Sequence, residues 1–269
     1  MKIGIMGLGQ VGSTLEYGFK RIGHHVVGYD PKLKGSRLED IDGTDVCFIC
    51  VPTPSRLDGA CDVSIVEKAV ADLESLTYSG VVAIKSTVTP GTTDRLQHQY
   101  QDLRLAFCPE FLREKSKFSD FVENHDVCII GTAIAEDTFT FEAIKYAHGS
   151  LPKQFAWTSS MEAEFAKYFS NCFNALRITF ANEFASICEA AGADYNNVKN
   201  AITKRSNIGD HYLDSNESFR AFGGNCLPKD TEAFSHYAAT LGRSVDLLDA
   251  MIGVNDVFQE EGKKDVTAA

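Results

Sequence analysis

The chain has 269 residues, 44% of them hydrophobic, which is enough for one large or two ordinary globular domains. Its formal net charge of −11 excludes the kind of basic surface that binds nucleic acid or anionic membranes non-specifically. No apolar run approaches the length of a membrane-spanning helix, and the N-terminus does not resemble a secretory signal, so we expect a cytoplasmic protein.

The first expected element is a buried strand over residues 2–6, which runs directly into a glycine-rich segment. That segment, Gly7-Leu8-Gly9-Gln10-Val11-Gly12, has the GxGxxG pattern of dinucleotide-binding loops. Gly7 permits a tight turn, Gly9 lets the backbone approach a pyrophosphate, and Gly12 lets the next helix pack closely on the strand. The first amides of that helix then bind the pyrophosphate.

A helical stretch at 13–22 and a second strand at 25–30 follow the loop, and the second strand ends in Asp30. A carboxylate at this position accepts hydrogen bonds from both ribose hydroxyls of NAD and repels the 2′-phosphate of NADP. We therefore expect NAD. Lys32 and Lys34 lie nearby and soften the repulsion, so NADP stays open as an alternative.

Short β-branched runs alternate with helical stretches in the first half of the chain. Further strands are expected at 45–51, 81–84, 103–107 and 127–130, and a helix at 62–76. This alternation is typical of α/β proteins. It predicts a doubly wound parallel sheet, that is, a Rossmann domain over residues 1–156.

From residue 157 onward the pattern is helical, so we expect an all-helical domain over 157–269 with one long central helix. Apolar residues that recur every three or four positions predict a helix of about thirty residues ending at Gly192. They are Met161, Phe165, Phe169, Cys172, Phe173, Leu176, Phe180, Phe184, Ile187 and Ala191. Shorter helices are expected at 194–204, 228–241 and 245–258. So long an aromatic stripe exceeds what a small domain covers, which predicts a homodimer packed through this helix.

The segment 222–230 (FGGNCLPKD) places a cysteine between a glycine-rich loop and an expected helix start. Pro228 suits the first turn of a helix, whose unpaired amides and positive dipole end favour the thiolate form of Cys226. Lys229 and Asp230 add a cation and a carboxylate within one turn. These neighbours predict a nucleophilic cysteine, with a buried structural cysteine as the alternative.

The other cysteines and the histidines predict no metal site. Cys47 and Cys50 match CxxC, but they lie in an expected strand, where positions three apart point to opposite faces. The seven histidines show no HExxH or paired metal spacing. The eight cysteines are scattered along the chain, which predicts reduced thiols and not disulfides.

Several separated motifs follow one another along the chain. They are GLGQVG at 7–12, VPTP at 51–54, KSTVTPGT at 85–92, PEFLRE at 109–114, a helix with Lys167 and Asn171, and FGGNCLPKD at 222–230. Together they resemble the UDP-glucose/GDP-mannose dehydrogenase family and span almost the entire chain. The resemblance implies a nucleotide-sugar 6-dehydrogenase of polysaccharide biosynthesis that oxidises a C6 alcohol to a carboxylate with two NAD. UDP-glucose is the first substrate to test.

The resemblance also implies a catalytic group: Cys226, Lys167, Asn171, Asp230, Glu110 and Thr87. Cys226 would attack the aldehyde formed by the first oxidation, and the thiohemiacetal would be oxidised to a thioester that water cleaves. Lys167 and Asn171 are four residues apart on one helix face and would donate hydrogen bonds to one oxyanion. Glu110 resembles the acid/base carboxylate, while Asp230 and Thr87 would position the water.

Two further sets of residues are assigned by the resemblance. The cofactor side holds Gly7, Gly9, Gln10, Val11, Gly12, Asp30, Thr53, Pro54, Ser86, Thr87 and Glu114. The substrate side holds Glu110, Phe111, Leu112, Lys167, Asn171, Tyr212, Arg220, Phe222 and Gly223. The assignment of Glu114 assumes that PEFLRE is helical, and a surface ion pair with Arg113 or Lys115 is the alternative.

Two features depart from the family pattern. Asn207 stands where family members usually have an arginine that contacts the sugar nucleotide, and Arg205 or Arg220 is the candidate substitute. Family members also normally continue into a second α/β domain that binds the nucleotide sugar, and this sequence ends after the helix near Phe258. Two other functions stay open: a β-hydroxyacid dehydrogenase, which uses a helix lysine and no cysteine, and a non-catalytic protein that binds NAD or a sugar nucleotide.

Overall fold

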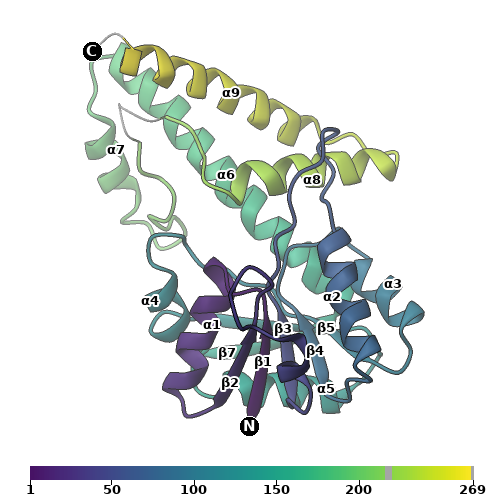
Figure 1. Ribbon diagram of the computed structural model, residues 1–269. Helices are drawn as coiled ribbons and strands as arrows, with labels where there is room; N and C mark the ends of the chain where they lie inside the picture. The colour runs from purple at the N-terminus through teal and green to yellow at the C-terminus, as the bar shows by residue number, and fades with distance from the viewer. Residues whose placement is uncertain (216–219, 268–269) are drawn as a thin grey trace. The chain divides into compact units, whose positions relative to one another are not determined.

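The computed structural model describes the backbone of residues 1–215 and 220–267 and the side chains up to residue 260 (Figure 1). The chain forms two compact units, one of residues 1–56 and 61–167 and the other of residues 57–60 and 168–269. The division at residue 167 lies beyond the expected boundary at 156, because the start of the long helix packs with the first unit. Ala163, for example, is fully buried in that unit's core.

The first unit is built on a mostly parallel sheet. Its described strands are β1 (Lys2–Met6), β2 (His25–Tyr29), β3 (Val46–Ile49), β4 (Val81–Ile84), β5 (Arg104–Phe107), β6 (Val127–Thr132) and β7 (Gln154–Ser159). They lie in the order β2-β1-β3-β4-β5-β6-β7. The order reverses between β1 and β3, which is where doubly wound sheets bind ligands at the carboxyl ends of their strands. The predicted Rossmann fold is confirmed.

Two strands depart from the sequence-based expectation. β6 pairs with β5 in an antiparallel manner, through Ala106–Thr132 and Phe107–Gly131. The connection between them carries only the short α4 (Lys117–Val122), which packs on α1, so no crossover helix brings the chain round for a parallel entry. β7 was not predicted, because every one of its residues is exposed or half-buried and no buried apolar run marks this edge strand.

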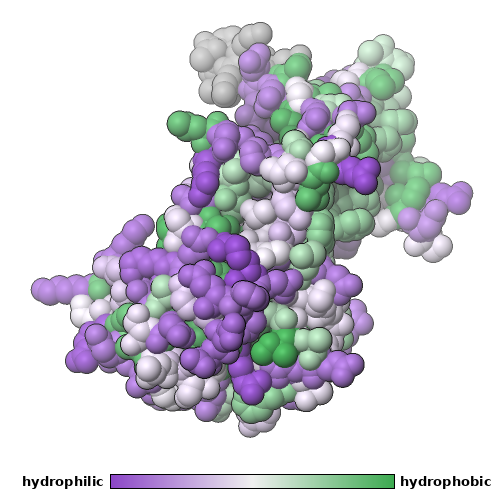
Figure 2. Space-filling view, turned by 90° about the vertical axis from the view of Figure 1, so that its right-hand side faces the viewer, coloured by the Kyte–Doolittle hydropathy of each residue, from purple (hydrophilic) through white to green (hydrophobic). Residues whose placement is uncertain are grey.

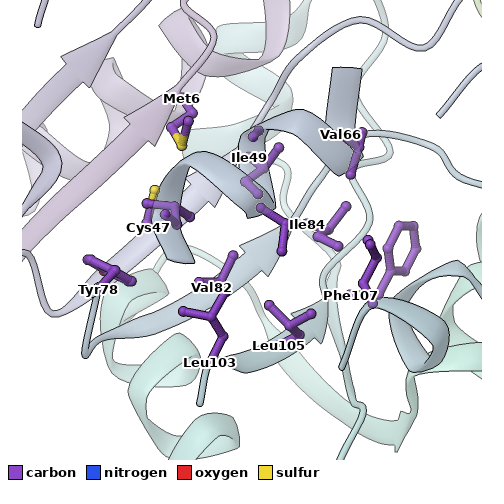
Figure 3. Close-up of a cluster of buried hydrophobic side chains, with 14 of the residues drawn as sticks. Met6, Cys47, Ile49, Val66, Tyr78, Val82, Ile84, Leu103, Leu105 and Phe107 are labelled. Atoms are coloured by element: carbon purple, nitrogen blue, oxygen red, sulfur yellow. The ribbon is translucent and has the colours of Figure 1, made fainter. Parts of the chain in front are cut away.

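Helices cover both faces of the sheet. They are α1 (Gln10–Arg21), η1 (Leu38–Ile41), α2 (Ser64–Ser75), α3 (Thr92–Gln99), α4 and α5 (Thr138–His148). Successive strand residues point to opposite faces. Val46 and Phe48 therefore pack in the core under α1 and α5, while Cys47 and Ile49 pack in the other core with Val66 of α2 (Figure 3). Burial on both faces explains why β3 and β4 are continuous apolar runs.

The second unit is helical. α6 (Ser160–Ala190) starts in the first unit and continues into this one, followed by α7 (Tyr195–Ile202), α8 (Leu227–Thr240) and α9 (Asp246–Thr267). The predicted long helix is confirmed, with 31 residues. Ala175, Phe222 and Met251 form a small buried core together with Leu227 and Leu248. α9 continues beyond the expected end at Phe258.

A row of large apolar side chains on α6 is exposed in this chain. Phe169 is 73% exposed, Phe180 59% and Ile187 62%, and Phe173 and Phe184 lie between them. Hydrophobic surface is correspondingly prominent on the helical unit in Figure 2. In the described part of the chain, no helix combines the length and the hydrophobicity of a membrane span.

Glu164 of α6 is a buried carboxyl that holds the start of α3. It accepts hydrogen bonds from the Gly91 and Thr93 amides, at 2.5 and 2.9 Å, and from the Thr93 hydroxyl at 2.6 Å. Burial nevertheless raises the pKa of Glu164 from 4.5 to about 7. The folded state therefore keeps a proton that the unfolded state has already lost.

This pKa difference predicts a pH dependence of stability. Because the folded chain binds the extra proton, Glu164 makes the free energy of unfolding fall as the pH rises from 4.5 toward 7. Glu164→Gln should remove that slope, on the order of 2 kcal/mol across the window, in denaturant unfolding at several pH values. Glu123→Gln, at an exposed residue of the same unit, should keep the wild-type slope. Parallel profiles for wild type and Glu164→Gln would contradict the assignment.

Candidate functional site

The glycine loop after β1 is shaped by backbone crowding at two of its glycines. Gly7 has φ +90°, and a Cβ atom there would lie 2.7 Å from the Cys50 carbonyl oxygen. A Cβ atom on Gly12 would lie 1.9 Å from the Gly7 carbonyl oxygen. At Gly9, which precedes α1, an added Cβ would meet nothing within 4 Å. The loop therefore packs tightly inward and presents open backbone at the helix N-terminus, where an anion binds.

Polar side chains make hydrogen bonds to this loop and at the start of α1. Asp30, at the end of β2, accepts hydrogen bonds from the Leu8 amide at 2.9 Å and the Lys32 amide at 3.0 Å. Gln10 is exposed at the start of α1 and accepts a hydrogen bond from Lys117, and Val11 beside it is half-buried. The half-buried Asp30 carboxylate thus lies beside the glycine loop, as the sequence predicted.

The segments after β3 and β4 lie at the same edge of the sheet, because parallel strands end on one side. The buried Ser86 hydroxyl donates to the Val51 carbonyl oxygen at 2.6 Å, which ties the two strand ends together. Thr53 is buried and Pro54 is exposed. Thr87 is half-buried, and its carbonyl oxygen accepts a hydrogen bond from the Cys61 thiol at 3.5 Å.

A buried ion pair follows β5. Lys167 Nζ donates to the Glu110 carboxylate at 2.9 Å and to the Glu110 carbonyl oxygen at 2.6 Å, and it lies 5.6 Å from the Phe111 ring centroid. The Leu112 amide donates to the other carboxylate oxygen at 2.7 Å. Burial alone would raise the pKa of Glu110, but Lys167 and the Leu112 amide hold it below its ordinary value. Glu110 is therefore an anion at neutral pH.

The expectation of a helical PEFLRE segment is wrong. Residues 109–113 are irregular and 114–116 form a turn, so Glu114 is exposed at a turn and does not follow Glu110 by one helical turn. Two carboxylate side chains accept hydrogen bonds from backbone amides of this segment. Glu110 accepts from the Leu112 amide, and Asp120 accepts from the Arg113 amide at 2.9 Å.

In the second unit, Cys226 is the N-cap residue of α8 and is exposed. Pro228 lies in the first turn, as predicted. Asp230, only 1% exposed, accepts hydrogen bonds from Asn171 Nδ2 and Lys229 Nζ, each at 2.5 Å. The thiol thus stands at a helix N-terminus, and within the first turn of that helix a buried carboxylate is held by two donors.

Lys167 and Asn171 lie four residues apart on α6, as the sequence required. Each already has an acceptor in its own unit: Lys167 binds Glu110, and Asn171 binds Asp230. Both side chains are nearly buried, with 3% and 7% exposed. Each unit therefore holds one of these two donors in a fixed hydrogen bond.

The expected substrate-side residues of the second unit occupy the loops before Cys226. The buried Phe222 precedes the half-buried Gly223, and Tyr212 has φ +62°. Arg220 forms an ion pair with Glu189. Arg205 Nε donates to the Asn207 side chain at 3.4 Å. Of the two candidate substitutes for the family arginine, Arg220 is thus oriented by a carboxylate of its own unit.

Two positioning residues were missed by sequence reasoning. Asn255 of α9 is 4% exposed and accepts the Phe222 amide at 2.7 Å, which fixes the loop before Cys226. Lys85, 2% exposed, donates to the Pro109 carbonyl oxygen at 3.3 Å, just before Glu110. A polar residue within an apolar helical pattern and a lysine directly after a buried strand were the available signals.

A mostly parallel sheet with a GxGxxG loop and a carboxylate after its second strand is the arrangement of a dinucleotide-binding domain. Residues 32–148 match the NAD binding domain of the UDP-glucose/GDP-mannose dehydrogenase family, and residues 161–257 match that family's central domain. The chain belongs to this family.

Individual relatives agree with that membership. UDP-glucose 6-dehydrogenase AglM of Haloferax volcanii is 32% identical, over 95% of this chain and 70% of AglM. The structure of a UDP-glucose dehydrogenase from Pyrobaculum islandicum matches with a TM-score of 0.85 and 30% identity, over 95% of this chain and 68% of that one. A Mycobacterium tuberculosis 3-hydroxyisobutyrate dehydrogenase shares the fold, with a TM-score of 0.75 and 15% identity, over 97% of this chain and 94% of that one.

NAD is the cofactor of this family's N-terminal domain, and the residues present fit it. The open backbone at Gly9 suits a pyrophosphate, and Asp30 suits ribose hydroxyls. The chain is thus an NAD-dependent oxidoreductase, and its relatives indicate nucleotide-sugar dehydrogenase activity.

The two glycines give a matched pair of variants. Gly9→Ala should leave thermal stability unchanged, because its Cβ meets no protein atom, but should weaken NAD binding about tenfold or more by blocking the pyrophosphate. Gly12→Ala should lower the melting temperature, because its Cβ would overlap the Gly7 carbonyl oxygen. Calorimetric NAD titration and thermal unfolding measure the two effects. Unchanged NAD affinity in Gly9→Ala would rule out this loop as the pyrophosphate site.

Proposed function

We propose that the chain is a nucleotide-sugar 6-dehydrogenase that oxidises UDP-glucose, or a related UDP-sugar, to the uronate. One observation carries the proposal: the exposed Cys226 stands at the N-terminus of α8, with the buried, doubly hydrogen-bonded Asp230 in the same first turn. Helix amides favour the thiolate, which is the reactive form. A cysteine that served packing alone would be buried, as Cys172 and Cys188 are in the same unit.

Cys226 makes a four-electron oxidation feasible in two steps. The C6 alcohol first loses a proton and a hydride to become an aldehyde. The Cys226 sulfur bonds to the aldehyde carbon, giving a thiohemiacetal that loses a second hydride to become a thioester. Water then adds, the carbon–sulfur bond breaks, and the carboxylate leaves. NAD, when bound, accepts the hydride at each oxidation, so the balance is alcohol, water and two NAD⁺ to carboxylate, two NADH and three protons.

The remaining polar groups stabilise charge and move protons. Lys167 and Asn171 offer two fixed donors for the oxyanions that form as the thiolate and water add. Glu110 is ionised in this state, so it begins the cycle as a proton acceptor. We assign Asp230 and Thr87 to orienting the water. For sugar-nucleotide contacts we assign Phe111, Leu112, Tyr212, Arg220, Phe222 and Gly223.

A β-hydroxyacid dehydrogenase is the second candidate, favoured by the ion-paired Lys167 on a long helix and by the shared fold with 3-hydroxyisobutyrate dehydrogenase. That reaction removes one hydride and needs no thiol. The role of Cys226 therefore separates the two candidates.

The proposed chemistry predicts the ratio of NADH to uronate formed. Incubation of the chain with UDP-glucose and NAD should yield two NADH per uronate, measured by absorbance and by chromatography of the sugar nucleotide. Cys226→Ser should abolish net acid formation, because the serine hydroxyl is not ionised near neutral pH and is a poor nucleophile toward the aldehyde.

Cys188→Ala, at a buried cysteine of the same unit, is the matched control and should keep the ratio. One NADH per turnover that survives Cys226→Ser would favour the β-hydroxyacid reaction. NAD binding without turnover on any UDP- or GDP-sugar would refute the first assignment, and the absence of turnover on a panel of β-hydroxyacids as well would refute both.

We also propose a homodimer formed through α6. Phe169, Phe173, Phe180, Phe184 and Ile187 are each at least 41% exposed and recur along the helix. An apolar row of this length is a protein-binding surface, because its burial removes several aromatic side chains from water. A second copy of α6 presents the same row, as a two-fold symmetric interface requires.

Light scattering at micromolar concentration tests the dimer. Wild type should have twice the chain mass of 29.5 kDa, and Phe180→Asp should be monomeric with unchanged circular dichroism, since Phe180 is 59% exposed in the single chain. Val198→Asp, at an exposed residue of α7, should stay dimeric. A monomeric wild type would contradict the proposal.

A further inference from the structure

Three side chains with soft ligand atoms meet inside the first unit. Cys108 directly follows β5, Cys128 lies in β6 and His148 ends α5. All three are buried, and one ligand atom from each lies within 4.8 Å of the others. The two sulfur atoms are 3.7 Å apart. Three elements distant in sequence thus bring two thiols and an imidazole to one point.

The histidine is oriented as a ligand. His148 Nδ1 donates to the Ile144 carbonyl oxygen at 2.9 Å, which leaves the lone pair on Nε2. Within the described part of the chain, Nε2 is buried and makes no hydrogen bond of good geometry. A metal-binding histidine shows this arrangement, with one ring nitrogen donating to a carbonyl and the other free to bind the ion.

The spacing suits a tetrahedral ion. Zinc binds thiolate at about 2.3 Å, which places two sulfur ligands roughly 3.7 Å apart at a tetrahedral angle. Two thiolates offset the charge of a divalent ion, which lowers the cost of burying it. Lys85 Nζ lies 3.3 Å from Cys108 Sγ and can donate to that sulfur, as partners of metal-bound thiolates do.

We propose that Cys108, Cys128 and His148 bind one zinc ion in the core of the first unit. The ion would link β5, β6 and α5. It would also fix the position of Cys108, which directly precedes Pro109 and Glu110. The proposal reverses the sequence-based expectation of no metal. The ligands come from separate strands and a helix, so no short motif marks them.

Metal content tests the site directly. We expect about one equivalent of zinc per chain, by plasma mass spectrometry, after refolding with zinc and a phosphine reductant and then desalting. Refolding with cobalt should give the visible bands of tetrahedral cobalt and the near-ultraviolet band of thiolate ligation. His148→Phe and Cys128→Ser should each lose the zinc, while Cys47→Ser, at a buried strand cysteine of the other core, should keep it.

Two results would overturn the proposal. One is less than roughly a tenth of an equivalent of zinc in refolded wild type, together with no cobalt charge-transfer band. The other is unchanged zinc content in His148→Phe. If a core variant fails to fold, the spectrum of cobalt-loaded wild type still tests whether the two thiols bind a metal. The zinc content and the cobalt spectrum are both independent of dehydrogenase activity.

Discussion

The fixing of two hydrogen-bond donors by carboxylates is the constraint on which the proposed chemistry depends. The donors are Lys167 of the first unit and Asn171 of the second, and both belong to α6. Each donor is held by a carboxylate of its own unit, Glu110 and Asp230 respectively, so neither side chain rotates freely. A donor that is already held in place needs no reorganisation when an oxyanion develops beside it.

Burying the charges of Lys167 and Glu110 costs desolvation free energy, and this cost bears on whether the pair serves stability or catalysis. Lys167 and Glu110 are 3% and 11% exposed, and removing both from water offsets much of their attraction. Replacing such a pair with apolar residues is often neutral or stabilising, whereas removing one partner costs about 3–5 kcal/mol. A buried ion pair in a domain that also carries a dinucleotide loop therefore fits a role in chemistry better than a role in stability. The same reasoning applies to Asp230, whose two donors compensate its burial.

Sequence reasoning succeeded where a local pattern determines the structure. The glycine loop, the buried strands and the apolar period of α6 each follow from neighbouring residues, and so does the start of α8 at Cys226. It failed where a distant group decides the outcome. PEFLRE is irregular because the Glu110 and Asp120 side chains capture its amides, and β6 runs antiparallel because no helix crosses back over the sheet. The contacts of Asn255 and Lys85, and the meeting of Cys108 with Cys128 and His148, also require the tertiary fold.

The central claim is that Cys226 forms a covalent bond with the sugar during turnover, and trapping that bond tests it most directly. The chain is mixed with NAD and UDP-glucose, quenched in acid during turnover, digested and analysed by mass spectrometry. We expect the peptide that contains Cys226 to carry the mass of the UDP-glucuronyl group as a thioester that hydroxylamine removes. An unmodified Cys226 under conditions that produce uronate, or the label on another residue, would contradict the mechanism.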